Sequence, residues 1–145
     1  MRALIQRVKR AKVKVDQKTV SQIKKGYLVF LAVGHNDQEK QAILLAKKVA
    51  NLRIMADKNQ KMNYSLKDVG GQALVVSQFT LLADCRRGNR PSFIKAAPPA
   101  KAKKLYQLFM AQLKEEKIKV KAGVFQAFMD VELVNQGPVT IMIDI

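Results

Sequence analysis

Two short segments contain the residues whose types and spacing could do chemistry. The first is Ser77-Gln78-Phe79-Thr80, which directly follows an apolar run, and polar residues at the end of a buried strand are uncommon. Backbone N–H groups at the point where a strand opens can hold an oxyanion, an arrangement that contributes a large share of acyl-transfer catalysis. Ser77 and Thr80 could instead only hydrogen-bond the backbone at the strand end, and the segment alone leaves both interpretations open.

The second segment is the pair Gly137-Pro138, which lies between apolar runs at residues 129–134 and 139–143. Proline has no N–H to give to a sheet, and glycine tolerates backbone angles that other residues avoid. An X-Pro bond can also be cis at a cost of only about 0.5–1 kcal/mol. The pair therefore places rigid, bare backbone at a strand edge, although a simple turn between two strands is the plainer interpretation.

Few other residues offer chemistry. Cys85 is the only cysteine and His35 the only histidine, so the chain can form neither an internal disulfide nor a tetrahedral zinc site from them. They lie in separate polar loops, and nothing in the sequence brings them together as a nucleophile and its base. No glycine-rich phosphate-binding spacing occurs. We therefore expect neither a metal nor another cofactor.

Charge is the strongest compositional signal. The chain has 27 Lys and Arg against 11 Asp and Glu, a net charge of +16. A positive field of this size attracts polyanions, so nucleic acid is the first partner to consider. Arg86, Arg87 and Arg90 form the densest arginine group and are candidate nucleic-acid-binding residues. Because the lysines are scattered along the chain, a generally solvated basic surface is the alternative.

The length of 145 residues suits one domain, residues 1–145, built around one hydrophobic core. No apolar run approaches the roughly 18–20 residues that a membrane helix needs. The N-terminus soon alternates apolar and charged residues and has no apolar block or cleavage site of a signal peptide. We therefore expect a cytoplasmic protein with no membrane partner.

Hydrophobic periodicity predicts mostly strands, with two helices. The expected strands cover residues 4–8, 13–15, 20–23, 27–33, 53–55, 73–81, 119–125, 129–134 and 139–143. The expected helices cover residues 38–52, with Asp37 placed to cap the first turn, and residues 98–117. This order favours an α+β fold, in which a curved, largely antiparallel sheet closes toward a barrel and two main helices pack outside it.

Taken together, four blocks of sequence resemble the D-aminoacyl-tRNA deacylase family. They are MRALIQRV at the start, GGQALVVSQFTL at residues 70–81, ADCRRGNRPSF at residues 83–93 and ELVNQGPVT at residues 132–140. The resemblance spans the whole chain, and the two signature segments, VSQFTL and NQGPVT, show no departure from the family pattern.

The resemblance implies a homodimer that hydrolyses the ester between a D-amino acid and the terminal adenosine of tRNA, and that also removes mischarged glycine. It implies that the segment from Ser77 to Thr80 lines the pocket. Gly137 and Pro138 would be joined by a cis peptide bond and would reach into the other subunit's site, where their bare backbone collides with L-amino acids. Arg7 is a plausible brace for this segment, through hydrogen bonds to nearby carbonyl groups.

Two catalytic routes and two other functions remain open. Thr80 could attack the ester carbonyl, but the sequence shows no partner to activate it. Alternatively, N–H groups around Phe79 and Thr80 hold the oxyanion while the substrate's ribose hydroxyl positions or activates water. The first alternative function is a non-catalytic basic nucleic-acid-binding module, which the absence of Trp and an aromatic content of only 6% disfavour. The second is an unrelated small-molecule hydrolase.

Overall fold

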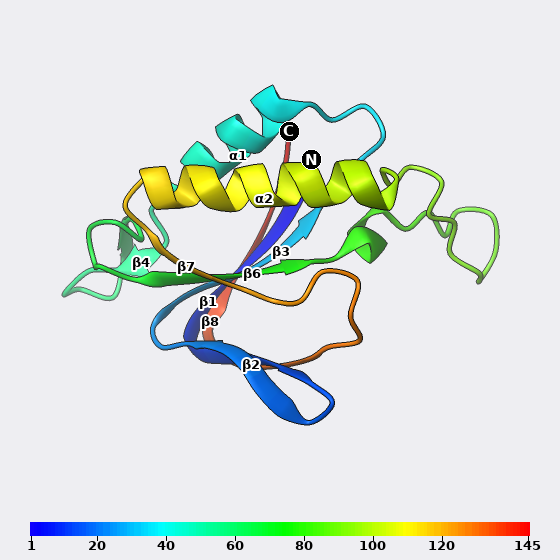
Figure 1. Cartoon of the computed structure of the whole chain (residues 1–145). Helices are drawn as coiled ribbons and strands as arrows, with labels where there is room; N and C mark the ends of the chain where they lie inside the picture. The colour runs from blue at the N-terminus through cyan, green and yellow to red at the C-terminus, as the bar shows by residue number, and fades with distance from the viewer.

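The computed structural model describes residues 1–145, which form one six-stranded sheet, one two-stranded sheet and two α-helices (Figure 1). The large sheet contains β1 (Arg2–Val15), β2 (Lys18–Ile23), β3 (Gly26–Ala32), β6 (Gln72–Ser77), β7 (Lys119–Ala122) and β8 (Asp130–Asp144). The small sheet pairs β4 (Met55–Ala56) with β5 (Met62–Tyr64). The helices are α1 (Glu39–Asn51), α2 (Pro99–Glu115) and a short 3₁₀ helix, η1 (Phe79–Leu82).

Strand β1 is the centre of the large sheet. It pairs antiparallel with β2 and β3 along one edge and with β8 along the other. The pairs β3–β6 and β6–β7 are parallel, because α1 and α2 carry the chain back across the sheet between them. Figure 1 shows both helices on the same side of the sheet. The predicted fold class, a curved sheet closing toward a barrel with two helices outside, is confirmed.

The hydrophobic core has two parts, one on each face of the sheet. The larger part lies against the helices and includes Tyr27 and Val29 of β3 together with Leu45 and Phe109. The smaller part lies on the other face and includes Leu28. Alternate residues of β3 therefore enter different clusters, which explains why the predicted strand at residues 27–33 is apolar throughout.

Two strands are longer than their hydrophobic patterns indicated. The predicted strands at residues 4–8 and 13–15 form the single strand β1, and those at 129–134 and 139–143 form the single strand β8. Each gap is spanned because β1 and β8 pair with one another along most of their length. Gly137 and Pro138 therefore lie inside a paired strand, and the interpretation as a plain turn between two strands is wrong.

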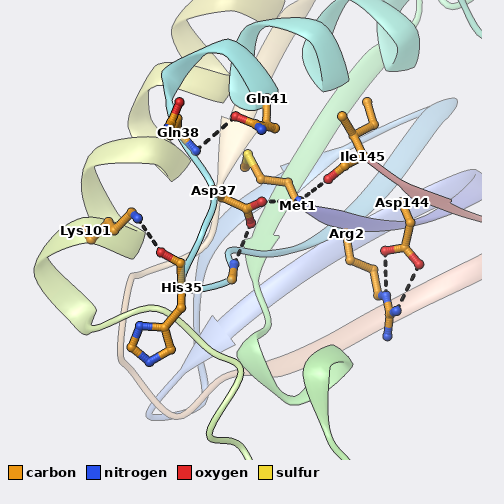
Figure 2. A network of polar contacts seen from close by, with 10 residues as sticks. Met1, Arg2, His35, Asp37, Gln38, Gln41, Lys101, Asp144 and Ile145 are labelled. Carbon is orange, nitrogen blue, oxygen red and sulfur yellow. Dashed lines mark hydrogen bonds and ion pairs between the residues drawn. The ribbon is translucent and has the colours of Figure 1, made fainter.

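Two local predictions were also wrong. Strand β6 ends at Ser77 rather than residue 81, because Leu31–Ser77 is the last pair that it forms with β3. Asp37 does not cap α1; the N-cap is Gln38, which forms a capping box with Gln41. The Asp37 carboxylate accepts instead from the Met1 amino group at 2.6 Å, as Figure 2 shows, and from the Gly34 N–H at 2.6 Å.

Candidate active site

The candidate site begins where β6 ends. The Gln78 N–H donates to the Leu31 carbonyl at 2.8 Å, which is the last backbone bond before the chain turns into η1. The first N–H groups of a short helix have no partner within it. The N–H groups of Phe79 and Thr80 accordingly find no acceptor anywhere in the chain. Since both residues are exposed, two backbone donors are free to bind a ligand oxygen.

The four residues Ser77, Gln78, Phe79 and Thr80 line a cavity with a volume of about 940 Å³. Four parts of the chain form its walls: the turn at His35, the end of β6 with η1, the segment that leads into α2, and residues 125–129 with Val131. Most of the lining is apolar, so the cavity suits a ligand whose polar groups are few and specifically placed. The polar backbone of η1 lies at this apolar surface.

The Thr80 hydroxyl has only one polar partner. It accepts a hydrogen bond from the Gln78 side-chain amide, and no titratable side chain hydrogen-bonds it. A nucleophilic hydroxyl needs an adjacent base within hydrogen-bond reach. The structure therefore places no base where it could activate the Thr80 hydroxyl.

Aromatic and helical contacts position the walls of the cavity. The rings of Phe79 and Phe93 meet edge to face, with centroids 5.1 Å apart, which joins η1 to the loop before α2. The Tyr106 hydroxyl of α2 donates to the Val75 carbonyl of β6 at 2.8 Å, and burial raises the pKa of Tyr106 to about 12. Helix α2 is thus fixed to the strand that ends at the site.

Several lining residues were not identified from the sequence. Phe128 is 99% exposed and Ile94 is 83% exposed, yet both line the cavity. Exposed apolar side chains such as these can mark a binding site. Their exposure depends on the fold, so the sequence alone did not reveal it. His35 also lines the cavity, although it is an exposed turn residue as expected. Cys85 lines a different, smaller cavity of about 360 Å³, so the two are not placed as a nucleophile–base pair.

Gly137 and Pro138 lie in a bulge of β8, and their peptide bond is cis. Gln6 pairs with Thr140, and Val8 pairs with Asn135. An advance of two residues along β1 therefore corresponds to five residues along β8. Both residues are exposed, and neither lines the cavity of its own chain. The structure therefore keeps the two signature segments of one chain apart.

Arg7 and Asn135 hold the base of this bulge. The Arg7 guanidinium is nearly buried and donates from Nε to the Gln136 carbonyl at 3.2 Å and from Nη1 to the Ile54 carbonyl at 2.6 Å. The Asn135 amide donates to the Arg7 carbonyl at 3.1 Å and to the Val139 carbonyl at 3.2 Å. The Arg7–Gln136 and Asn135–Arg7 bonds cross between β1 and β8 where the regular ladder is interrupted.

The three predicted tRNA-binding arginines differ in their surroundings. Arg86 forms an ion pair with Asp84, and its guanidinium holds the pKa of the Asp84 carboxyl well below its usual range. Arg87 and Arg90 are exposed and form no ion pair. Their charge is therefore more available to a partner than that of Arg86. No cluster of three or more His, Cys, Asp or Glu side chains is arranged to hold a metal ion.

Comparison with known proteins identifies the family. A profile of the family described as D-Tyr-tRNA(Tyr) deacylase matches residues 4–144. The D-aminoacyl-tRNA deacylase of Thermotoga petrophila is 57% identical over 144 residues, which cover 99% of this chain and 97% of that protein. The corresponding protein of Carboxydothermus hydrogenoformans is 50% identical over 145 residues and all of both chains.

Two solved structures have the same fold. A c-Myc DNA unwinding element binding protein superposes with a TM-score of 0.92 at 36% identity, covering 99% of this chain and 98% of that chain. A probable eukaryotic D-amino acid tRNA deacylase superposes with a TM-score of 0.86 at 17% identity, with the same coverage. The chain therefore belongs to the D-Tyr-tRNA(Tyr) deacylase family. The family inferred from the sequence blocks is confirmed, as is the prediction that the chain is a hydrolase. No helix is long and apolar enough to cross a membrane.

The contacts of Arg7 lead to a stability prediction. Arg7→Met removes the donor of the Ile54 and Gln136 carbonyls, and an unsatisfied buried polar group costs about 1–3 kcal/mol. We expect the free energy of unfolding to fall by about that amount, as measured by denaturant titration. Arg10→Met, an exposed position on the same strand, serves as the control and should change stability by less than about 0.5 kcal/mol. Equal losses in both variants would contradict this account.

Proposed function

We propose that this chain hydrolyses the ester that links a D-amino acid to the terminal adenosine of tRNA, and that it does so in the cytoplasm. Its membership of the deacylase family supports an aminoacylated tRNA as substrate. The observation that carries the chemical part of the proposal is the pair of free N–H groups of Phe79 and Thr80 at the edge of an apolar cavity. Donors held in such a place stabilise a developing oxyanion.

In the proposed reaction, water adds to the ester carbonyl carbon and the carbonyl oxygen becomes an oxyanion. The N–H groups of Phe79 and Thr80 donate to this oxygen. The ester bond then breaks, and the ribose oxygen leaves with a proton that the attacking water has lost. The neighbouring ribose hydroxyl of the substrate positions or activates the water, because no base contacts Thr80.

Selection between enantiomers is assigned to Gly137 and Pro138. We propose that this pair enters the cavity of a second copy of the chain in a homodimer, where bare backbone collides with the side chain of an L-amino acid. The pair projects from β8, is exposed, and is held at its base by Arg7 and Asn135. Because glycine has no side chain to collide, mischarged glycine is also accepted.

A non-catalytic nucleic-acid-binding module is the alternative function. Two observations favour it: the net charge of +16, and the name of the structurally similar DNA unwinding element binding protein. Binding alone requires neither the free N–H pair nor the apolar cavity. The two functions differ in whether D-aminoacyl-tRNA is hydrolysed or only bound.

The decisive experiment is to incubate the protein with D-tyrosyl-tRNA and with L-tyrosyl-tRNA. We expect rapid release of D-tyrosine and little release of L-tyrosine above the spontaneous rate, because only the L side chain meets the Gly137-Pro138 backbone. Single-turnover release of labelled amino acid measures both rates. Binding of both tRNAs without release of either amino acid would establish the alternative function instead.

Substitution of Thr80 distinguishes the two catalytic routes. If the backbone N–H groups hold the oxyanion, Thr80→Ala should retain kcat within about tenfold, since loss of a true oxyanion donor costs about 10²–10³. Thr80→Ser keeps the hydroxyl and is the matched control. Activity that falls to background in Thr80→Ala but survives in Thr80→Ser would show that the hydroxyl takes part in the chemistry. Both rates are measured on D-tyrosyl-tRNA.

The free arginines predict a salt-dependent affinity for tRNA. If Arg87 and Arg90 bind acceptor-stem phosphates, KM should rise steeply with salt, because binding releases counterions. Replacing either one by Gln should lower the slope of log KM against log salt by about 1. Arg86→Gln should lower it less, because Asp84 already occupies that guanidinium. A KM that does not change with salt would contradict phosphate binding by this loop.

A further inference from the structure

Arg2, the first residue of β1, connects three parts of the chain. Its Nε and Nη2 atoms donate to the two carboxylate oxygens of Asp144 on β8, at 2.7 and 2.9 Å. Its remaining nitrogen, Nη1, donates to the Leu81 carbonyl of η1 at 2.7 Å. Figure 2 shows the two-pronged contact between Arg2 and Asp144. One planar guanidinium therefore joins the β1–β8 pair to the 3₁₀ helix that carries the free N–H groups.

Helix η1 has little packing of its own to hold it in place. None of its four residues is buried, and Phe79 is 53% exposed. At its start, the bond from Gln78 to the Leu31 carbonyl fixes the chain, and the Phe79 ring packs against Phe93. Toward its end, the Leu81 carbonyl receives the bond from Arg2. The orientation of the helix thus depends on a few directional contacts at its two ends.

We propose that Arg2, oriented by Asp144, is a positioning residue for deacylation. It holds η1 so that the N–H groups of Phe79 and Thr80 point at the same oxygen of the substrate. This inference rests on the proposed function, because it assigns those N–H groups to the oxyanion. Arg2 itself lines the smaller cavity and not the one that contains Thr80, so it acts through η1 rather than on the substrate.

The exposure of the Arg2–Asp144 ion pair allows a positioning role to be distinguished from a contribution to stability. The side chains of Arg2 and Asp144 are 31% and 58% exposed, and pairs this exposed contribute little to stability. The guanidinium fork nevertheless fixes direction, since its donors are rigidly arranged in a plane. A lysine ammonium can meet one carboxylate but cannot reproduce the fork that also reaches Leu81. Loss of Arg2 should therefore appear in the rate rather than in the stability.

The test compares Arg2→Lys and Asp144→Asn with Glu132→Gln. Glu132→Gln is the control. It breaks the ion pairs of Glu132 with Lys12 and Lys14, which also join β1 to β8 but at the opposite end of the two strands from Arg2. We expect kcat on D-tyrosyl-tRNA to fall about 10- to 100-fold in Arg2→Lys, because misplacement by about 1 Å can cost 10² in rate. Asp144→Asn should cause a smaller loss, and KM should stay within about twofold of the wild type in both. Melting temperatures should match that of Glu132→Gln.

A second measurement does not depend on activity. Backbone ¹⁵N order parameters of residues 79–82 should fall in Arg2→Lys from the rigid value of about 0.85 toward 0.6, and stay unchanged in Glu132→Gln. Unchanged order parameters, or a wild-type kcat in Arg2→Lys, would overturn the proposal. A raised KM with a weaker salt dependence would also overturn it, since Arg2 would then bind a substrate phosphate. If the wild type hydrolyses no D-aminoacyl-tRNA, the proposed function fails, and the order parameters still decide whether Arg2 holds η1 in place.

Discussion

The pairing of β1 along both of its edges is the constraint on which the rest of the structure depends. One edge bonds β3 and β2, and the other bonds β8, so the backbone of β1 has little freedom to move. Two arginines leave this strand and bind carbonyl groups of less regular segments: Arg2 bonds to η1, and Arg7 bonds to the bulge of β8. The strand that is paired along both edges thus positions the two segments to which a function is assigned.

A site built from main-chain groups differs from one built from side chains. The positions of the Phe79 and Thr80 N–H groups follow from where β6 stops pairing, and they do not depend on a side-chain rotamer. Most of the lining of the cavity beside them is apolar. In such surroundings an N–H group interacts more strongly with a developing charge than it would in water. If these N–H groups hold the oxyanion, as proposed, the chain needs no base, nucleophile pair or metal cluster that its sequence would reveal.

Local patterns predicted the parts of the fold that depend on local interactions. The spacings of three and four that indicated α1 and α2 reflect faces that do become buried, at Val49 and Phe109 for example. The predicted strand ends were wrong where the neighbouring strand determines the end. Strand β6 ends at Ser77, for example, because its pairing with β3 ends there. Asp37 was misassigned because its partner, the Met1 amino group, is distant in sequence. Arg2 was missed for the same reason, whereas the Asp84–Arg86 pair, two residues apart, could have been inferred from the sequence.

The bulge in β8 also bears on how this protein can change over evolutionary time. Residues 130–135 pair with β1 on one side of it and residues 140–144 pair on the other, so each half of the ladder has its own register. Residues 136–139, between these halves, contribute no rung to either. Gly137 and Pro138 are the exposed residues of this stretch and could vary without breaking a rung, whereas Val139 is buried in the larger core cluster and the Gln136 carbonyl accepts from Arg7. The fold can therefore tolerate inherited variation at these two exposed positions without a matching loss of stability.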